Sequence, residues 1–342
     1  MEIAETLEAL CKAEGVSGAE SAACRAALDI LKKYTDNAEI TPFGCVRGFI
    51  GDKNNRLKTV MLEAHIDEIG FIVTYIDEKG FVKAGRCGGT DSRLYAAQTV
   101  TIHGENGCIK GVVATLPPHV AADSKKTMKI EDLSIDTGYS KEQLLKLIAP
   151  GDRITIDSGF TRLSGSRVTS KALDDRAGVA AVLYALELVK DKQLKYNVEI
   201  LFSGQEETGS RGAIIEAYNS AADFAIATDV SYAYTPDAKR EKCGDMGKGA
   251  MIGVSPSLDM PLTEELKRLC KEKNISYQLE IMGGETGTDA DEISVSKGGI
   301  KTALVSIPLK YMHTPVEVVD LEDVKSVGRI MAEFLTGGES DV

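Results

Sequence analysis

The sequence contains no tryptophan, and aromatic residues make up only 6% of its 342 residues. Sites that bind sugars often use aromatic platforms, so this composition disfavours a carbohydrate-binding site. Cationic residues are also in deficit, because 40 Lys and Arg stand against 52 Asp and Glu, for a formal net charge of −12. Binding to nucleic-acid phosphates needs a surplus of cationic side chains. We therefore expect no nucleic-acid partner.

Long hydrophobic runs are missing as well. No apolar run approaches the ~20 residues that a membrane-spanning helix needs, and residues 1–6 lack the basic start of a signal peptide. The seven cysteines are an odd number and include no C-x-x-C pair, which fits neither a disulfide framework nor a thiolate zinc site. We expect a cytoplasmic protein with no membrane partner.

The remaining composition, 43% apolar and 27% charged, is that of a globular protein. The chain length suggests about two domains. Apolar residues recur at helical spacing near the N-terminus, and Ser17-Gly18-Ala19-Glu20 has the form of a capping box that opens a helix over residues 17–34. Strand-like runs follow at 46–50 and 59–64, the second apolar enough to be buried on both faces.

The character of the sequence changes between residues 69 and 160. Short β-rich runs alternate there with Gly, Pro and charged turns, and one short helix is expected near 141–148. Many short strands without alternating helices indicate a small barrel or sandwich. After residue 160, strands and helices alternate again, which is typical of a doubly wound α/β layer. We predict an α/β domain of residues 1–68 and 161–342, interrupted by an all-β, barrel-like insert of residues 69–160.

Five segments place Asp, Glu or His directly after a strand-like run, where open α/β sheets present ligands. In the first, His65 and Asp67 are two residues apart, so both side chains can lie on one side of an extended segment. If His65 binds a metal, Asp67 can hold its other ring N–H. The alternative is a half-buried histidine beside a surface acid.

The second segment contains Asp174 and Asp175 at the start of a helix, where a carboxylate could bridge two metals or simply cap the helix. The third contains Glu206 and Glu207, which suit a division of labour in which one binds a cation and the other moves a proton. Two solvated loop acids are the alternative. The fourth and fifth segments contribute Asp229 and His313.

Together these segments offer two histidines and at least three carboxylates, a nitrogen and oxygen set that suits zinc, cobalt or manganese. Two-metal hydrolases share such carboxylates between cations. Competing motifs are absent, because the sequence has no G-x-G-x-x-G after a strand, no G-x-S-x-G and no H-E-x-x-H.

The same segments, in order along almost the whole chain, resemble the M42 family of aminopeptidases, some relatives of which have been labelled endoglucanases. The matching motifs are His65-x-Asp67-Glu68-x-Gly70, Leu173-Asp174-Asp175-Arg176-x-Gly178, Gln205-Glu206-Glu207-x-Gly209, Thr228-Asp229-Val230, Gly287-Thr288-Asp289-Ala290 and His313-x-Pro315-x-Glu317. The resemblance implies a metal-peptidase domain with a β-barrel-like insert.

The resemblance also implies residue roles. One metal would be held by His65, Asp174 and Asp229, and the other by Asp174, Glu207 and His313. Glu206 would be the general base, and Asp67 would orient His65. The family further implies two divalent ions, zinc or cobalt with manganese as an option, short peptides as substrates, and a homo-dodecamer built from dimers joined through the insert.

We also predict that residues 284–291 border the substrate pocket, where Asp289, Asp291 or Glu285 could attract a basic residue or repel an acidic one. Asp289 is the predicted substrate-binding residue. The competing function is a metal-dependent deacylase acting on N-acylated peptides, which would use similar metals. A glucanase would instead need two carboxylates that flank the bond and no metal. A non-catalytic scaffold is disfavoured by the complete set of expected ligands.

Overall fold

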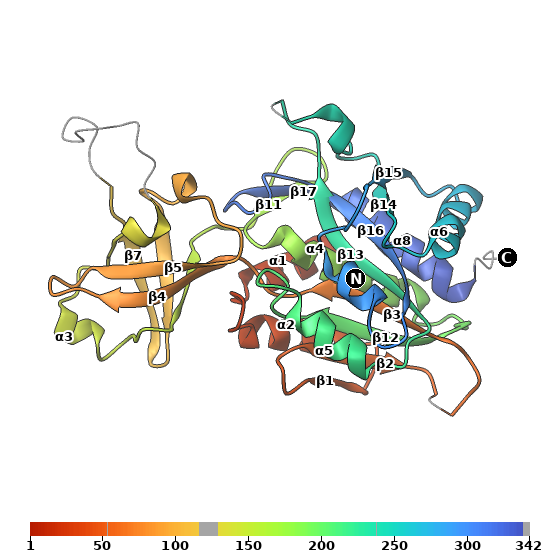
Figure 1. The fold of residues 1–342 in the computed structure, drawn as a ribbon, viewed down its shortest axis with the longest axis horizontal. Coiled ribbons are helices and arrows are strands. Elements are labelled where there is room, and N and C mark those ends of the chain that lie inside the picture. The colour runs from red at the N-terminus through yellow and green to blue at the C-terminus, as the bar shows by residue number, and fades with distance from the viewer. Residues whose placement is uncertain (53, 116–128, 237, 338–342) are drawn as a thin grey trace.

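The computed structural model describes residues 1–52, 54–115, 129–236 and 238–337, which form a larger α/β lobe and a smaller β lobe (Figure 1). The α-helices are α1 (Ile3–Lys12), α2 (Ser21–Leu31), α3 (Lys141–Leu144), α4 (Leu173–Val189), α5 (Arg211–Asn219), α6 (Met260–Glu272), α7 (Asp289–Ser294) and α8 (Leu321–Thr336). Short 3₁₀ helices span Ser92–Leu94, Ile130–Asp132 and Arg240–Lys242.

The larger lobe is built on one mixed sheet. Its strands are β1 (Ala38–Ile40), β2 (Val46–Ile50), β3 (Thr59–His65), β10 (Thr161–Arg162), β11 (Arg167–Ser170), β12 (Asn197–Ser203), β13 (Phe224–Tyr232), β14 (Ala250–Val254), β15 (Tyr277–Ile281), β16 (Lys301–Lys310) and β17 (Glu317–Asp320). The order is β1-β2-β12-β3-β13-β16-β17-β11-β10, and β14 pairs with β16 and β15. Strands β12, β3, β13 and β16 run parallel.

Helices cover both faces of this sheet. On β3, Val60, Leu62 and Ala64 pack into the core shared with α1, α4 and α8. Met61, between them, packs on the opposite face with residues of α5 and α7 such as Ala213. Because successive side chains of a strand point to opposite faces, a parallel strand buried on both faces is apolar throughout. The predicted doubly wound α/β layer is confirmed.

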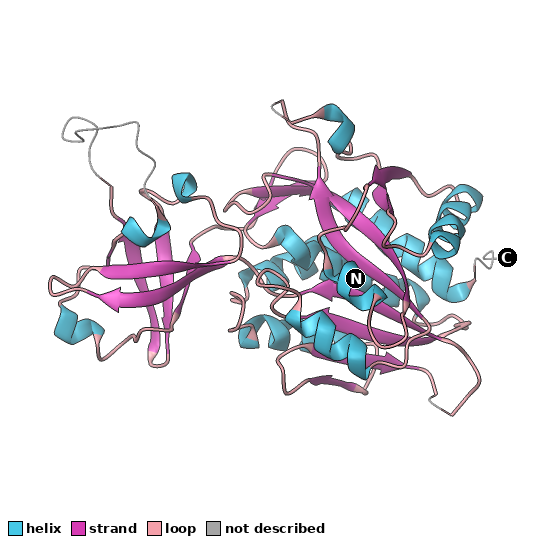
Figure 2. Ribbon diagram, viewed as in Figure 1, coloured by secondary structure: helices cyan, strands magenta, loops and turns pink. Residues whose placement is uncertain are grey.

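The smaller lobe is a closed barrel in the order β4-β5-β8-β7-β6-β9 (Figure 2). Its strands are β4 (Gly70–Ile76), β5 (Val82–Cys87), β6 (Thr99–Gly104), β7 (Gly107–Val113), β8 (Ile135–Asp136) and β9 (Arg153–Ile156). Alternate residues fill its interior, including Phe71, Val100, Ile102 and Ile154, as in small barrels closed by side chains. The barrel-like character of the insert is confirmed, while its limits at 69 and 160 and its role in dimerisation stay predictions.

Two local expectations were wrong. Helix α2 begins at Ser21 rather than Ser17, and its N-cap residue Glu20 makes no side-chain cap hydrogen bond. The Glu20 carboxylate accepts the Gly18 N–H instead, and the Ser17 hydroxyl donates to Asp67. A distant partner, Asp67, therefore takes the Ser17 hydroxyl, while Glu20 bonds locally to the turn before the helix. The sequence analysis also missed strands β14 and β15, at the edge of the sheet.

All seven cysteines are free thiols. Among the described residues, no helix is long and apolar enough to cross a membrane.

Candidate metal centre

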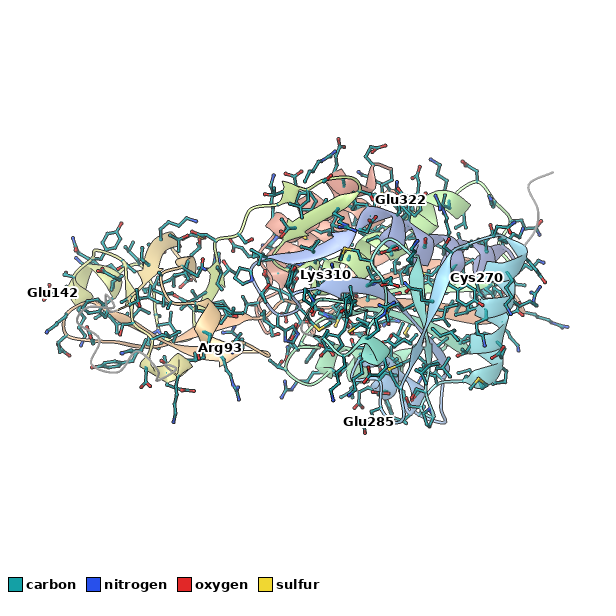
Figure 3. All side chains as sticks on the ribbon, turned by 90° about the horizontal axis from the view of Figure 1, so that it is seen from above. Arg93, Glu142, Cys270, Glu285, Lys310 and Glu322 are labelled. Carbon is teal, nitrogen blue, oxygen red and sulfur yellow. The ribbon has the colours of Figure 1, made fainter. Side chains whose placement is uncertain are left out.

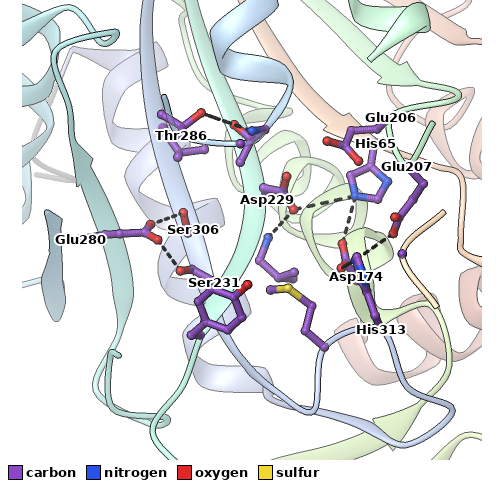
Figure 4. Close-up of a pocket in the computed structure, with 17 residues that line it drawn as sticks. His65, Asp174, Glu206, Glu207, Asp229, Ser231, Glu280, Thr286, Ser306 and His313 are labelled. Carbon is purple, nitrogen blue, oxygen red and sulfur yellow. Dashed lines mark hydrogen bonds and ion pairs between the residues drawn. The ribbon is translucent and has the colours of Figure 1, made fainter. Parts of the chain in front are cut away.

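The side chains expected at the site come together at the carboxyl-terminal edge of the parallel strands (Figure 4). Four segments belong to or follow β3, β12, β13 and β16, and the fifth is the start of α4. His65 ends β3, Glu206 and Glu207 follow β12, and Asp229 lies in β13. His313 follows β16, and Asp174 stands at the start of α4. Parallel strands bring their carboxyl ends to one edge, which is where open α/β sheets bind ligands.

Asp174 lies at the centre of this arrangement, because each of its carboxylate oxygens faces a different imidazole. Its Oδ1 lies 3.0 Å from His65 Nε2, and its Oδ2 lies 3.3 Å from His313 Nε2. Asp229 Oδ1 lies 3.8 Å from His65 Nε2, and Glu207 Oε1 lies 3.3 Å from His313 Nε2. The result is two groups of three donors that share Asp174, with the donor atoms of each group within 4.8 Å of one another.

The start of α4 separates Asp174 from Asp175, which residue chemistry alone could not distinguish and of which the family resemblance singled out Asp174. Asp175 acts as the local cap, because its Oδ1 accepts the Gly178 N–H at 3.0 Å. Asp174 and Asp175 both have non-helical backbone angles at the start of this helix. The Asp174 side chain is thereby free to face the histidines, and the capping alternative applies to Asp175 only.

Asp67 is fully buried and connects His65 to the loop that carries the glutamates. Its Oδ1 lies 3.5 Å from His65 Nδ1. The same carboxylate accepts the backbone N–H of Glu206 at 3.0 Å and that of Glu207 at 3.2 Å, and the Ser17 hydroxyl at 2.5 Å. The Asp67 carboxylate thus lies beside the His65 ring and holds the glutamate loop through two backbone hydrogen bonds. Its role in orienting the ring stays a prediction.

Glu317 positions two of the expected ligands through their backbone. Its Oε1 accepts the His313 N–H at 2.9 Å, and its Oε2 accepts the Asp174 N–H at 3.2 Å. The side chain is 2% exposed. The sequence analysis gave Glu317 no role, although its spacing from His313 was part of the family motif.

The buried guanidinium of Arg176 connects several segments that carry site residues. Arg176 is 0% exposed and donates to the Ile66 carbonyl at 3.2 Å, to the Leu10 and Ala13 carbonyls, and to Glu68 at 3.2 Å. Lys171 also contacts the Glu68 carboxylate, at 2.6 Å. A buried charge is tolerated when it is paired and hydrogen-bonded in this way. The network fastens α4 and the segment after β3 to α1.

Glu206 lines the pocket but belongs to neither of the two groups that share Asp174. Burial raises the pKa of Glu206 to about 8, opposed by His65 and reinforced by the nearby carboxylates of Asp289 and Glu207. Desolvation also raises the pKa of Asp229 well above its usual range. So many buried carboxylates in one place are unfavourable without a compensating positive charge.

This donor set fits divalent metal ions. Imidazole nitrogens and carboxylate oxygens suit zinc, cobalt and manganese, and the shared carboxylate suits a pair of cations. None of the described residues that line the pocket is Lys or Arg, so the imidazoles of His65 and His313 are the groups there that can carry positive charge. Against the effect of burial, the neighbouring carboxylates raise the pKa of both histidines. The same nitrogen and oxygen atoms that attract protons here are the ones that could bind metal.

The pocket has a volume of about 410 Å³ and extends beyond these groups along β13, β15 and β16, a size typical of small-molecule sites. Thr286, Gly287 and Thr288 contribute to its lining. Asp289 does not, because it is 3% exposed and accepts the Ser203 hydroxyl at 2.5 Å. Its contact with substrate stays a prediction that this geometry does not favour. Glu280, which the sequence analysis missed, does line the pocket.

Comparison with known proteins agrees with this architecture. The M42 glutamyl aminopeptidase family matches residues 44–330. The lysyl aminopeptidase of Pyrococcus furiosus is 32% identical over 339 residues, covering 97% of this chain and 96% of that protein. The aminopeptidase APDkam598 from Desulfurococcus kamchatkensis superposes with a TM-score of 0.92 at 32% identity, over 98% of this chain and 95% of the other.

A second structural relative, the TET1 peptidase of Pyrococcus horikoshii, has a TM-score of 0.86 at 28% identity, with 98% and 99% of the two chains covered. That peptidase is described as assembling into a tetrahedron or a large octahedral shell. The fold, the order of the motifs and the extent of these matches lead to one conclusion: the chain belongs to the M42 glutamyl aminopeptidase family.

Proposed function

We propose that this chain is a dinuclear metal-dependent aminopeptidase that removes the N-terminal residue from short peptides. The observation that carries the proposal is the position of Asp174 between His65 and His313, at 3.0 and 3.3 Å. With Asp229 and Glu207 these side chains would form two three-ligand sites. Zinc or cobalt suits this set, with manganese as an alternative.

Two cations bound there would polarise the scissile carbonyl and make a hydroxide nucleophile available near neutral pH. The chain's own contribution is then a proton carrier beside them. Glu206 suits this role because it belongs to neither of the two proposed metal sites. It does lie close to a ligand of each site, since the donor atoms of His65, Glu206 and Glu207 are also within 4.8 Å of one another. Glu206 takes a proton from the attacking water and delivers it to the nitrogen of the departing peptide.

The cluster also explains a preference for a free N-terminus. Two divalent cations would balance the charge of Asp174, Asp229, Glu206 and Glu207, so a peptide's terminal amine would be held by local contacts with carboxylate oxygens beside the metals rather than by a net negative field. Asp67 would hold His65 and the Glu206 loop in place while the substrate binds. An N-acylated peptide lacks this amine, so we expect it to be a poor substrate.

The proposal also includes the oligomeric state of the protein and its cellular location. A homo-dodecamer built from dimers would use the barrel lobe, whose strand β7 exposes Val112 at 47%, and the TET1 relative forms closed shells. Seven free thiols fit a reducing compartment such as the cytoplasm. Light scattering on the purified chain measures the oligomer directly.

The experiment that tests the function strips metal with a chelator and returns zinc, cobalt or manganese in known amounts. Release of the first residue should require metal, rise up to two equivalents per chain, and fail on the N-acetylated form of the same peptide. Cleavage of the acetylated peptide at an equal rate would favour the deacylase, and activity that survives complete stripping would refute the metal mechanism.

A further inference from the structure

The pocket has a second polar end, formed by Glu280 on β15 together with Ser231 on β13 and Ser306 on β16. Figure 4 shows this end across the pocket from Asp174 and His313, with Asp229 between the two ends. A substrate whose reacting bond lies at the histidine end would therefore extend its side chain toward Glu280.

Two serine hydroxyls hold the Glu280 carboxylate. Ser231 donates to Oε1, and Ser306 donates to Oε2 at 2.7 Å. Both serines are buried, whereas Glu280 is half-buried and lines the pocket. Each carboxylate oxygen is thus oriented by a neutral donor and keeps lone pairs available for a further partner.

No Lys or Arg in the described part of the chain pairs with this carboxylate. Within the described ranges, Glu280 has no ion-pair partner, and the pocket lining includes no Lys or Arg. Burial raises the pKa of Glu280, while the two serine hydrogen bonds act in the opposite direction. The Glu280 carboxylate is oriented by the two serines and open to the pocket, so it can bind a positive group that enters with the substrate.

The strand register gives the offset along β13 between Asp229, near the metal end, and Ser231, at the Glu280 end. Asp229 is directly paired with Ser306, and Ser231 lies two residues further along β13. At ~3.3 Å per residue, two residues correspond to about 7 Å. Gly253 of β14 is the partner of Glu280 and has no side chain to stand between Glu280 and β16. A long flexible side chain such as that of lysine can cover this distance.

The wall between the ends is apolar in part. Leu304, Met312 and Val230 line the pocket beside the polar groups. Lysine and arginine bury their methylene stems along such surfaces while the charged head reaches a polar partner.

We infer that Glu280 binds the cationic side chain of the substrate's N-terminal residue, so that the enzyme prefers peptides that begin with Lys or Arg. This inference rests on the proposed function. It also locates the acidic specificity residue on β15 rather than at Asp289, whose carboxylate is turned to Ser203. The terminal ammonium is a less suitable partner for Glu280, because it lies next to the scissile carbonyl and hence at the metal end.

The first test compares lysyl and norleucyl substrates with the same chromogenic leaving group on the metal-replete wild-type enzyme. The two side chains have similar stems, and only lysine carries the ammonium group. We expect kcat/KM to be at least ~10-fold higher for the lysyl substrate, the scale of one hydrogen bond between charged groups. An equal or lower value would overturn the inference.

The second test uses Glu280→Gln, which keeps the size and removes the charge. We expect kcat/KM to fall ~10–100-fold on lysyl and arginyl substrates and to change less than threefold on leucyl and norleucyl substrates. Glu285→Gln is the matched control, because Glu285 is exposed on the surface of the larger lobe and does not line the pocket (Figure 3). It should keep the wild-type ratio.

The remaining outcomes separate this inference from the proposed function. Uniform loss on all substrates by Glu280→Gln, with metal content and thermal midpoint unchanged, would give Glu280 a general role and overturn the inference. If the variant does not fold, the wild-type comparison still decides. Absence of activity on every free-amine substrate with each metal would instead refute the proposed function.

Discussion

The Glu317 carboxylate accepts the backbone N–H of Asp174 at 3.2 Å, so a residue at the start of β17 sets the position of the carboxylate at the centre of the site. The other oxygen of Glu317 accepts the His313 N–H. The Glu317 side chain belongs to neither of the two groups proposed to bind metal. Its effect on the site is therefore one of positioning.

Replacing Glu317 by Gln should weaken metal binding while leaving the ligands in place. A glutamine can accept one of the two backbone N–H groups but presents a second donor to the other. Changes in such outer hydrogen bonds typically cost about 10–100-fold in metal affinity or activity. Metal titration into the stripped protein measures the shift, and Glu322→Gln, an exposed change on α8, is the control (Figure 3). Unchanged affinity would contradict the positioning role.

Replacing Glu206 by Gln should separate chemistry from metal binding. The variant should hold the same metal content as the wild type and lose about 10²–10⁴-fold in kcat, the usual contribution of a general acid–base group. Elemental analysis and steady-state rates on one preparation give both numbers. Wild-type turnover in a metal-replete variant would remove Glu206 from the mechanism.

His313→Ala should remove one ligand from the site that His313 forms with Asp174 and Glu207. The other site, formed by His65, Asp174 and Asp229, keeps its three donors. We expect about one metal equivalent less per chain after dialysis against a limiting metal buffer. Ligand binding stabilises the folded state by about 2.7 kcal/mol per site at 100 times Kd. The rise in unfolding free energy on metal addition should therefore be smaller by this order than in the wild type. Equal metal content would count against His313 as a ligand.

Arg176→Met should destabilise the fold without any direct contact to the site. The change leaves the buried Glu68 carboxylate with Lys171 and the Gly15 N–H, and it removes the donors to the Leu10, Ala13 and Ile66 carbonyls. Breaking a buried ion pair costs about 3–5 kcal/mol. Denaturant unfolding of the metal-free protein measures the loss, with the exposed Arg329→Met as control. A difference below about 1 kcal/mol would show that Lys171 and water satisfy these groups.

Much of the candidate site follows from local sequence. His65, Asp229 and the Glu206–Glu207 pair each stand at or just after an apolar run, and parallel strands bring their carboxyl ends to one edge. Local residue chemistry could not distinguish Asp174 from Asp175, because both open the same helix and either could cap it, and only the family resemblance favoured Asp174. The backbone at the start of α4 decided this, by assigning the Gly178 N–H to Asp175.

Other residues could not be predicted because their partners are distant in the chain. Ser17 and Glu20 have the pattern of a helix cap, yet Ser17 donates to Asp67. Glu280 lies in the amphipathic segment Tyr277–Ile281, with no catalytic motif around it. The pairing of β15 with β14, and of β14 with β16, places its side chain in the pocket.

The sequence alone determined the order of the main helices and core strands and the residue types that can bind metal, because these depend on periodicity and on chemistry within short segments. Only the tertiary structure decided how the two Asp174 oxygens face the two imidazoles, which acids accept backbone N–H groups, and which acid lines the far end of the pocket. Those outcomes depend on strand pairing and helix packing between residues far apart in the chain, and no local pattern specifies such distances.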